Sequence, residues 1–121
     1  MGEIATSIRQ ITLFYNSKCV IASQTLAYAK ASGVAVLDID ILKTPLTGTQ
    51  IVELAQRLKI TVADLVNQEL PDYKAAFEPH NYSTNDWIKM IQNNPELMKQ
   101  PIALRGDFTI LVKTPTDILK L

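Results

Sequence analysis

The sequence is poor in residues that bind metals or form disulfides, with one cysteine, Cys19, and one histidine, His80, among 121 residues. One cysteine cannot form an internal disulfide, and the chain lacks the Cys and His spacing of a zinc site. We therefore expect no bound metal, and thiol redox chemistry has to take its second thiol from a partner. His80 is far from Cys19 in sequence and is better interpreted as a solvated loop residue than as a general base.

An excess of charge of either sign is also absent, because 12 Lys and Arg balance 12 Asp and Glu. This balance gives no overall field toward nucleic acid or an anionic membrane. Apolar runs such as residues 34–37 are far shorter than the roughly 20 residues that span a bilayer. The first residues lack the basic stretch and apolar core of a signal peptide. We therefore expect a cytoplasmic protein with no nucleic-acid or membrane partner.

The first third of the chain has the pattern strand, helix, strand. Residues 11–15 are β-branched and aromatic, which predicts a buried strand that ends in a polar turn. Residues 20–32 are mostly good helix formers, and Gly33 suits the helix end. A second apolar run at residues 34–39 completes a parallel crossover unit. This pattern places Cys19 at the N-terminus of the helix.

Helical patterns follow, with predicted caps at Thr49, at Thr61 and at Ser83 or Thr84, whereas residues 71–79 show little periodicity. Residues 102–104 and 108–112 then predict an antiparallel hairpin. A closing helix is expected after the cap and proline at residues 114–115.

The order of these elements predicts one domain over residues 1–121 of the α/β class. It is a thioredoxin-like mixed four-stranded sheet with a helical insertion at about residues 47–99.

Cys19 is the candidate reactive atom of this fold. A thiolate is the nucleophilic form of cysteine, and a helix N-terminus lowers the thiol pKa because unpaired N–H groups favour the anion. Lys18 could add positive charge, and Ser17 and Ser23 offer hydroxyl donors. A lone cysteine can also be a compact hydrophobic residue, but its place at a strand-to-helix turn favours the reactive interpretation.

Several segments of the chain resemble the glutaredoxin-coupled arsenate reductase family. FYNSKC at residues 14–19 and SQTL at residues 23–26 are similar to the family's active-site loop and first helix. The similarity continues in DILKTPLT at 40–47, ITVADLVN at 60–67 and NPELMKQPI at 94–102. The order and spacing of these segments make the resemblance specific, and it covers nearly the whole chain.

The resemblance implies an activity and a set of partners. In that family the cysteine thiolate attacks arsenate, arginines neutralise the oxyanion, and glutathione with glutaredoxin completes the reduction. It therefore implies no bound cofactor, glutathione as a co-substrate, and a small thiol or a redox protein such as glutaredoxin as partner. It also implies a cis peptide bond before Pro101, since thioredoxin-like proteins hold this proline in the cis form beside the cysteine.

The chain departs from the family where the family places positive charge. Ser23, Asn67 and Gln100 stand at positions of the family's cationic residues, and Lys113 replaces the last arginine. These changes remove most of the bidentate groups that suit a tetrahedral oxyanion, which argues against arsenate as the substrate.

Two comparisons with the family's pattern remain. Arg105, Lys18 or Lys113 could replace the missing charge, and Arg105 is the leading candidate. Ala22 stands where the related Spx-type regulators carry the second cysteine of a Cys-x-x-Cys switch, which excludes that internal switch.

Three functions stay open on the sequence. The first is a monothiol oxidoreductase that forms a mixed disulfide between Cys19 and a small thiol. The second is a non-catalytic protein-binding or regulatory module on the same fold, favoured by the missing arginines. The third is a true arsenate reductase with rebuilt anion contacts.

Overall fold

The computed structural model describes residues 6–77 and 81–121, so the expectation for His80 lies outside the described residues. The described chain forms two compact units. Among the described residues, the helical unit is Pro45–Lys99, and the sheet unit comprises residues 6–44 together with Gln100–Leu121. The expectation of a single domain stays a prediction.

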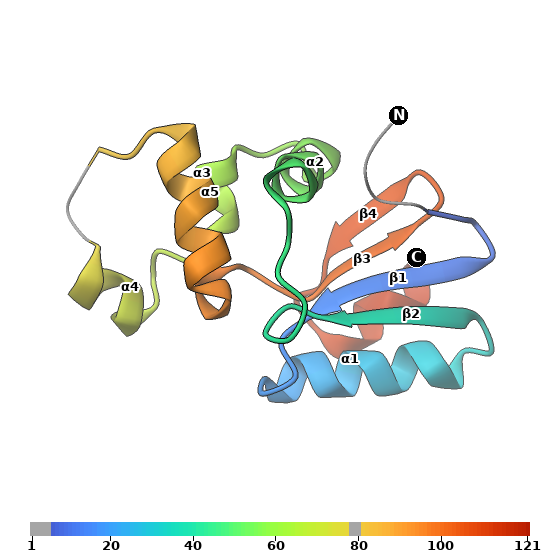
Figure 1. Ribbon diagram of the computed structural model, residues 1–121. Coiled ribbons are helices and arrows are strands. Elements are labelled where there is room, and N and C mark those ends of the chain that lie inside the picture. The colour runs from blue at the N-terminus through green and yellow to red at the C-terminus, as the bar shows by residue number, and fades with distance from the viewer. Residues whose placement is uncertain (1–5, 78–80) are drawn as a thin grey trace. The chain divides into compact units, whose positions relative to one another are not determined.

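The sheet unit contains a mixed sheet with the strand order β2-β1-β3-β4 (Figure 1). The first strand runs parallel to the second and antiparallel to the third, and the third and fourth form an antiparallel hairpin. The predicted α/β class, parallel crossover and hairpin are thereby confirmed. Within the described residues the elements of this unit are β1 (Gln10–Tyr15), α1 (Val20–Ala31), β2 (Ala35–Asp40), β3 (Ile102–Arg105), β4 (Phe108–Leu111) and the 3-10 helix η2 (Pro115–Lys120).

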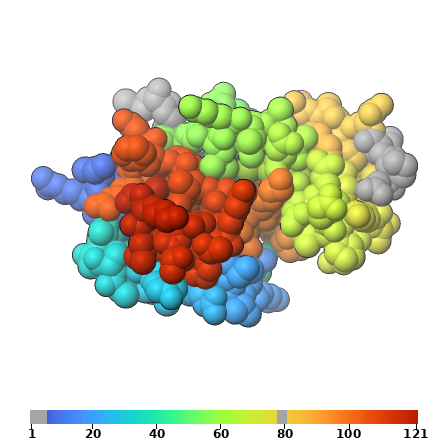
Figure 2. Space-filling view, turned by 180° about the vertical axis from the view of Figure 1, so that it is seen from behind, coloured from blue at the N-terminus to red at the C-terminus, as the bar shows by residue number. Residues whose placement is uncertain are grey.

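The core of the sheet unit lies between the sheet and the two helices that pack on one of its faces. Ile11 and Leu13 of β1 form a buried cluster with Ala29 of α1 and Ile118 of η2. Figure 2 shows η2, in red, on the same face of this unit as α1, in light blue. The predicted closing helix is present, and it is a 3-10 helix.

The helical unit is built from short helices, several of which begin with a capping box. Thr47, Thr61 and Ser83 each accept a hydrogen bond from the backbone three residues later. This confirms the caps predicted at Thr61 and Ser83 and corrects Thr49 to Thr47, because Gln50 completes the box only with Thr47. The elements of this unit are α2 (Gly48–Leu58), α3 (Val62–Leu65), α4 (Pro71–Ala76), α5 (Thr84–Asn93) and the 3-10 helix η1 (Pro95–Leu97).

Helix α4 falls in the segment where the sequence showed little periodicity. Tyr73 is its one buried residue, and a six-residue helix with a single buried side chain gives no repeating pattern. Tyr73 packs within this unit between Phe77 and Trp87, with ring centroids 6.0 and 6.2 Å away. Among the described residues, no helix has the length and apolar character needed to cross a membrane.

Candidate functional site

Cys19 lies in the tight turn that joins β1 to α1. The turn closes by a 3.0 Å hydrogen bond from the Cys19 N–H to the Asn16 carbonyl, and the Lys18 N–H donates to Asn16 Oδ1 at 2.8 Å. Cys19 is extended at φ −95° and ψ 127° and occupies the N-cap position of α1. The prediction that the cysteine stands at a helix N-terminus is therefore confirmed.

The surroundings of the Cys19 thiol favour its ionised form. Burial of this half-buried side chain would raise its pKa, but donors at Ala22 N–H, the Gln100 side chain and Ile21 N–H outweigh burial, and the pKa is lowered. The thiol makes no capping hydrogen bond of the kind that Thr47 makes in α2. The N–H groups still lower the pKa because a thiolate is a much better acceptor than a thiol.

Gln100 reaches this turn from a distant part of the chain. The antiparallel register pairs Phe14 with Ile102, so the residues before β3 lie beyond the carboxyl end of β1. There the Asn16 N–H donates to Gln100 Oε1 at 3.0 Å. The following residue, Pro101, is buried, and its peptide bond with Gln100 is cis, as expected.

Ser17 faces a carboxylate to which the sequence assigned no role. Its N–H donates to Asp40 Oδ1 at 3.4 Å, and Asp40 is only 9% exposed. Burial would raise the Asp40 pKa, but hydrogen bonds from Ser17 and the Leu42 N–H, with the charge of Lys43, lower it. The parallel register places Asp40 opposite Tyr15, at the end of β1 from which the Cys19 turn begins. In the sequence, only the predicted ends of the two strands indicated that Asp40 lies close to this turn. We interpret Asp40 as the carboxylate that holds the turn.

The sequence neighbours of Cys19 are apolar or uncharged, apart from Lys18. Val20 and Ile21 are 70% and 44% exposed. Ser23 is exposed one turn into α1, where its N–H donates to the Cys19 carbonyl at 3.0 Å. Lys18 is also exposed, and the groups that lower the thiol pKa are uncharged.

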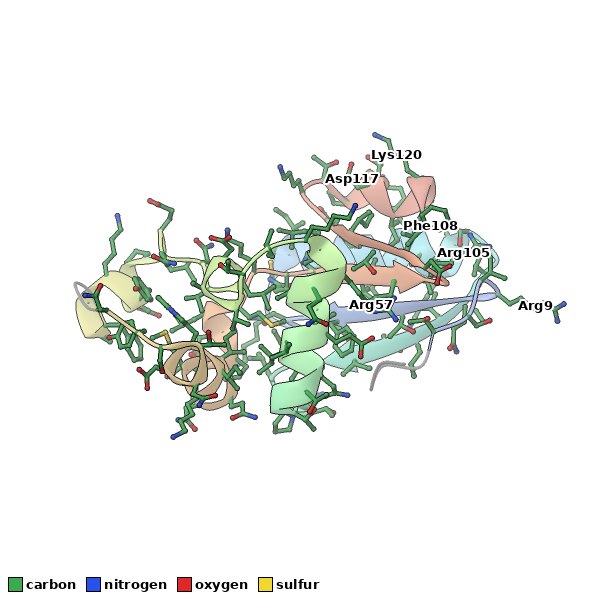
Figure 3. The ribbon with its side chains drawn as sticks, turned by 90° about the horizontal axis from the view of Figure 1, so that it is seen from above. Arg9, Arg57, Arg105, Phe108, Asp117 and Lys120 are labelled. Atoms are coloured by element: carbon green, nitrogen blue, oxygen red, sulfur yellow. The ribbon has the colours of Figure 1, made fainter. Side chains whose placement is uncertain are left out.

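The structure corrects the expectation for Arg105. Continuing the β1–β3 register places Arg105 opposite Ile11, about 13 Å of strand before Tyr15, at the end of the sheet away from Cys19. Its guanidinium donates to the carbonyls of Ile8 at 2.6 Å and Leu121 at 3.2 Å. Figure 3 shows Arg105 at the β3–β4 hairpin near Phe108. Arg105 therefore joins chain segments and supplies no charge to the thiol.

Lys113 and Asn67 are the remaining candidates. Lys113 is exposed and follows β4 at the same end of the sheet as Gln100, because Leu111 pairs with Ile102; its N–H donates to Asp117 Oδ2 at 3.0 Å. Asn67 lies in the helical unit, where its N–H donates to the Leu97 carbonyl at 2.8 Å and its Oδ1 accepts from the Glu69 N–H. A role for either residue at the thiol stays a prediction.

Metal binding has no candidate centre in the described part of the chain. There, no group of three or more His, Cys, Asp or Glu side chains could hold an ion.

Solved structures share this fold, although no known family model and no curated protein matches the chain by sequence. A candidate arsenate reductase from Yersinia pestis is 21% identical, with a TM-score of 0.83 over 92% of this chain and 99% of that one. An arsenate reductase from Vibrio cholerae is 21% identical, with a TM-score of 0.81 over 93% and 97%. An arsenate reductase-related protein from Brucella melitensis is 15% identical, with a TM-score of 0.68 over 99% and 100%. At these identities the likeness shows the fold.

Proposed function

We propose that this protein is a divergent member of the arsenate reductase family that acts as a monothiol oxidoreductase through Cys19. The observation that carries the proposal is the thiol at the N-cap of α1, where N–H donors and the Gln100 side chain lower its pKa. A thiolate held at moderate exposure beside a helix N-terminus is the arrangement that makes a cysteine an effective nucleophile. The likeness of fold to arsenate reductase structures supports the family assignment.

The proposed reaction is thiol–disulfide exchange. Cys19 Sγ attacks one sulfur of a disulfide R–S–S–R′, a new Sγ–S bond forms, and R′–S⁻ leaves with the electron pair of the broken bond and takes up a proton. A second thiol then attacks the R sulfur and releases the Cys19 thiolate. Two electrons thus pass from the incoming thiol to the departing sulfur. Because the chain has one cysteine, this second thiol belongs to glutathione or a redox protein such as glutaredoxin, and we expect the exchange in the cytoplasm.

A disulfide suits this site better than a tetrahedral oxyanion. The donors that face the thiol are uncharged, and Arg105 is engaged with the Ile8 and Leu121 carbonyls. Stabilising a multiply charged oxyanion needs fixed positive donors, whereas disulfide exchange needs an accessible thiolate and a leaving group.

The decisive test measures the ionisation and reactivity of Cys19 together. The rate of iodoacetamide alkylation is followed from pH 5 to 10, and the mixed disulfide formed with oxidised glutathione is detected by mass spectrometry. We expect an apparent thiol pKa below ~8.5, the free-cysteine value, and an adduct that glutaredoxin with glutathione removes. Cys19→Ser is the control for both readouts. An apparent pKa at or above ~8.5 would sink the activated-thiol proposal.

A protein-binding module is the second candidate, favoured by the exposed surface of α1. This helix has one charged residue, Lys30, and it exposes the large apolar side chains of Val20, Ile21 and Tyr28. Apolar side chains that form one exposed patch are typical of partner surfaces. An ordinary Cys19 pKa with no glutathione adduct would favour this candidate.

Arsenate reduction is tested separately from disulfide exchange. Arsenate turnover is measured with glutathione and glutaredoxin present, again with Cys19→Ser as the control. We expect no rate above the control, because the donors facing the thiol are neutral. A rate clearly above the control would show that the anion contacts have been rebuilt elsewhere.

A further inference from the structure

The orientation of the Gln100 side-chain amide is determined by its neighbour in the turn. A backbone N–H can only donate, so the amide atom that faces the Asn16 N–H at 3.0 Å is the oxygen Oε1. The other arm of the amide is therefore the NH₂ group, which can only donate. The Gln100 side chain is also one of the donors that lower the Cys19 pKa, and with Oε1 occupied by the Asn16 N–H in the same turn, the arm left to donate is Nε2.

We propose that Gln100 is a positioning residue for Cys19: the Asn16 N–H holds Oε1, and the Nε2 group thereby donates to Sγ and holds the thiolate on the open side of the turn. This inference rests on the proposed function and names the residue that prepares its nucleophile. The Asn16 N–H, the Gln100 amide and Cys19 Sγ form a chain of hydrogen bonds, here called the relay. It joins two segments of the chain that are 84 residues apart.

A neutral residue at position 100 suits this relay. Gln100 can donate only one or two hydrogen bonds and carries no charge, so it favours the thiolate without creating a binding site for a second anion. An arginine in its place would attract an oxyanion. The chemical class of substrate that follows is an uncharged sulfur electrophile, the S–S bond of a glutathione-type mixed disulfide.

The charged groups near the turn do not duplicate this contact. Lys18 is exposed in the turn itself, Asp40 at the end of β2 is bound by Ser17, and Lys113 is exposed beyond the end of β4. The Gln100 amide therefore lowers the thiol pKa from the strand side, and the N–H groups of Ala22 and Ile21 lower it from the helix side.

The test compares two substitutions that change the two arms of the amide in different ways. Gln100→Leu removes both arms. Gln100→Glu keeps an oxygen for the Asn16 N–H but replaces the donor with a negatively charged acceptor. Gln24→Glu is the matched control, because it adds the same charge to exposed α1 without a contact to the thiol. Each protein is titrated through its thiolate absorbance at 240 nm and its alkylation rate, and folding is checked by circular dichroism.

We expect the Cys19 pKa to rise by about one unit in Gln100→Leu, and by more in Gln100→Glu, where a carboxylate faces the thiolate. In Gln24→Glu it should stay within about 0.2 units of wild type. If Gln100→Leu fails to fold, Gln100→Glu decides, because its Asn16 contact is retained. A low wild-type pKa that neither Gln100 variant changes would overturn the positioning role and leave the proposed function standing. An ordinary wild-type pKa would instead remove the proposed function.

Discussion

Three α-helices of the helical unit begin differently from the one α-helix of the described sheet unit, whereas α4, which follows Leu70, has no side-chain cap either. Helices α2, α3 and α5 start at Thr47, Thr61 and Ser83, each with a reciprocal capping box. Helix α1 starts at Cys19, whose side chain makes no capping hydrogen bond. The first three arrangements satisfy backbone N–H groups with hydroxyl oxygens, which stabilises each helix by about 1 kcal/mol.

Helix α1 lacks a stabilising N-cap hydrogen bond because a cysteine occupies its N-cap position. A neutral thiol is a poor hydrogen-bond acceptor, so the first N–H groups of α1 are weakly satisfied until Cys19 ionises. The same N–H groups lower the thiol pKa. In α2, α3 and α5 the hydrogen bonds to the first N–H groups therefore stabilise the helix directly. In α1 the same groups instead favour the ionised form of Cys19.

The largest expected effect comes from giving α1 a hydroxyl cap. We predict that Cys19→Ser loses all mixed-disulfide formation, because the nucleophilic sulfur is absent, yet gains roughly 0.5–1 kcal/mol in the free energy of unfolding. Mass spectrometry after oxidised glutathione and urea unfolding at pH 6 measure the two effects. Cys19→Ala, which removes sulfur without adding a cap, should lose the adduct and gain no stability. Equal stability of the two variants would contradict the capping argument.

The second effect concerns Arg105, whose guanidinium binds two carbonyls in the sheet unit. We predict that Arg105→Met lowers the free energy of unfolding by about 2 kcal/mol, since two charge-assisted hydrogen bonds are lost. The Cys19 pKa should not change, because Arg105 lies at the other end of the sheet. Urea unfolding and thiol titration measure both quantities.

Arg9→Met is the matched control for this prediction. Arg9 is exposed and points away from the sheet in Figure 3, so its loss should cost less than about 0.5 kcal/mol. A shift of the Cys19 pKa in Arg105→Met would restore Arg105 as a candidate for the thiol site.

A third prediction concerns the caps of the helical unit. Thr47→Ala should lower the free energy of unfolding by about 1 kcal/mol, because the Gln50 N–H loses its 3.1 Å acceptor. Thr49→Ala, two residues later inside α2, is the control and should change it by less than about 0.5 kcal/mol. Neither substitution should change the Cys19 alkylation rate. Similar losses in both variants would show that the capping box is not the stabilising contact.

The smallest effect is the pH dependence of stability due to Cys19. Its folded pKa lies below its unfolded value, so between the two the unfolded state binds more protons and stability rises with pH. This contribution is fully present above the unfolded pKa of ~8.5 and is lost as pH falls through the folded pKa. It is measured as the difference in unfolding free energy between wild type and Cys19→Ala from pH 6 to 9.5. A difference that falls over that range would contradict the lowered pKa.

Local sequence signals predicted the elements with their own caps or continuous apolar runs. The strands, the cap residues Thr61 and Ser83, and the turn that presents Cys19 were predicted correctly. Helix α4 was missed because a single buried residue, Tyr73, leaves no periodicity. Thr49 was preferred to Thr47 because two nearby threonines are equivalent until the Gln50 side chain selects one.

The sequence predicted the position of Cys19 in the candidate site but not which residues from other segments lie beside it. The resemblance to arsenate reductases pointed to Gln100, and the charge missing there pointed to Arg105 as a replacement. Nothing local distinguishes a residue just before β3 from one at its end. The strand register places the first beside the turn and the second about 13 Å of strand away.

The sequence by itself determined that a strand of apolar residues ends in a polar turn and that Cys19 opens the next helix, because these features depend on neighbouring residues. Tertiary structure alone decided which side chain meets the sulfur. Pairing of β3 with β1 brings Gln100 to Asn16 across 84 residues. A hydrogen bond between segments so distant depends on strand register, which only the assembled sheet defines.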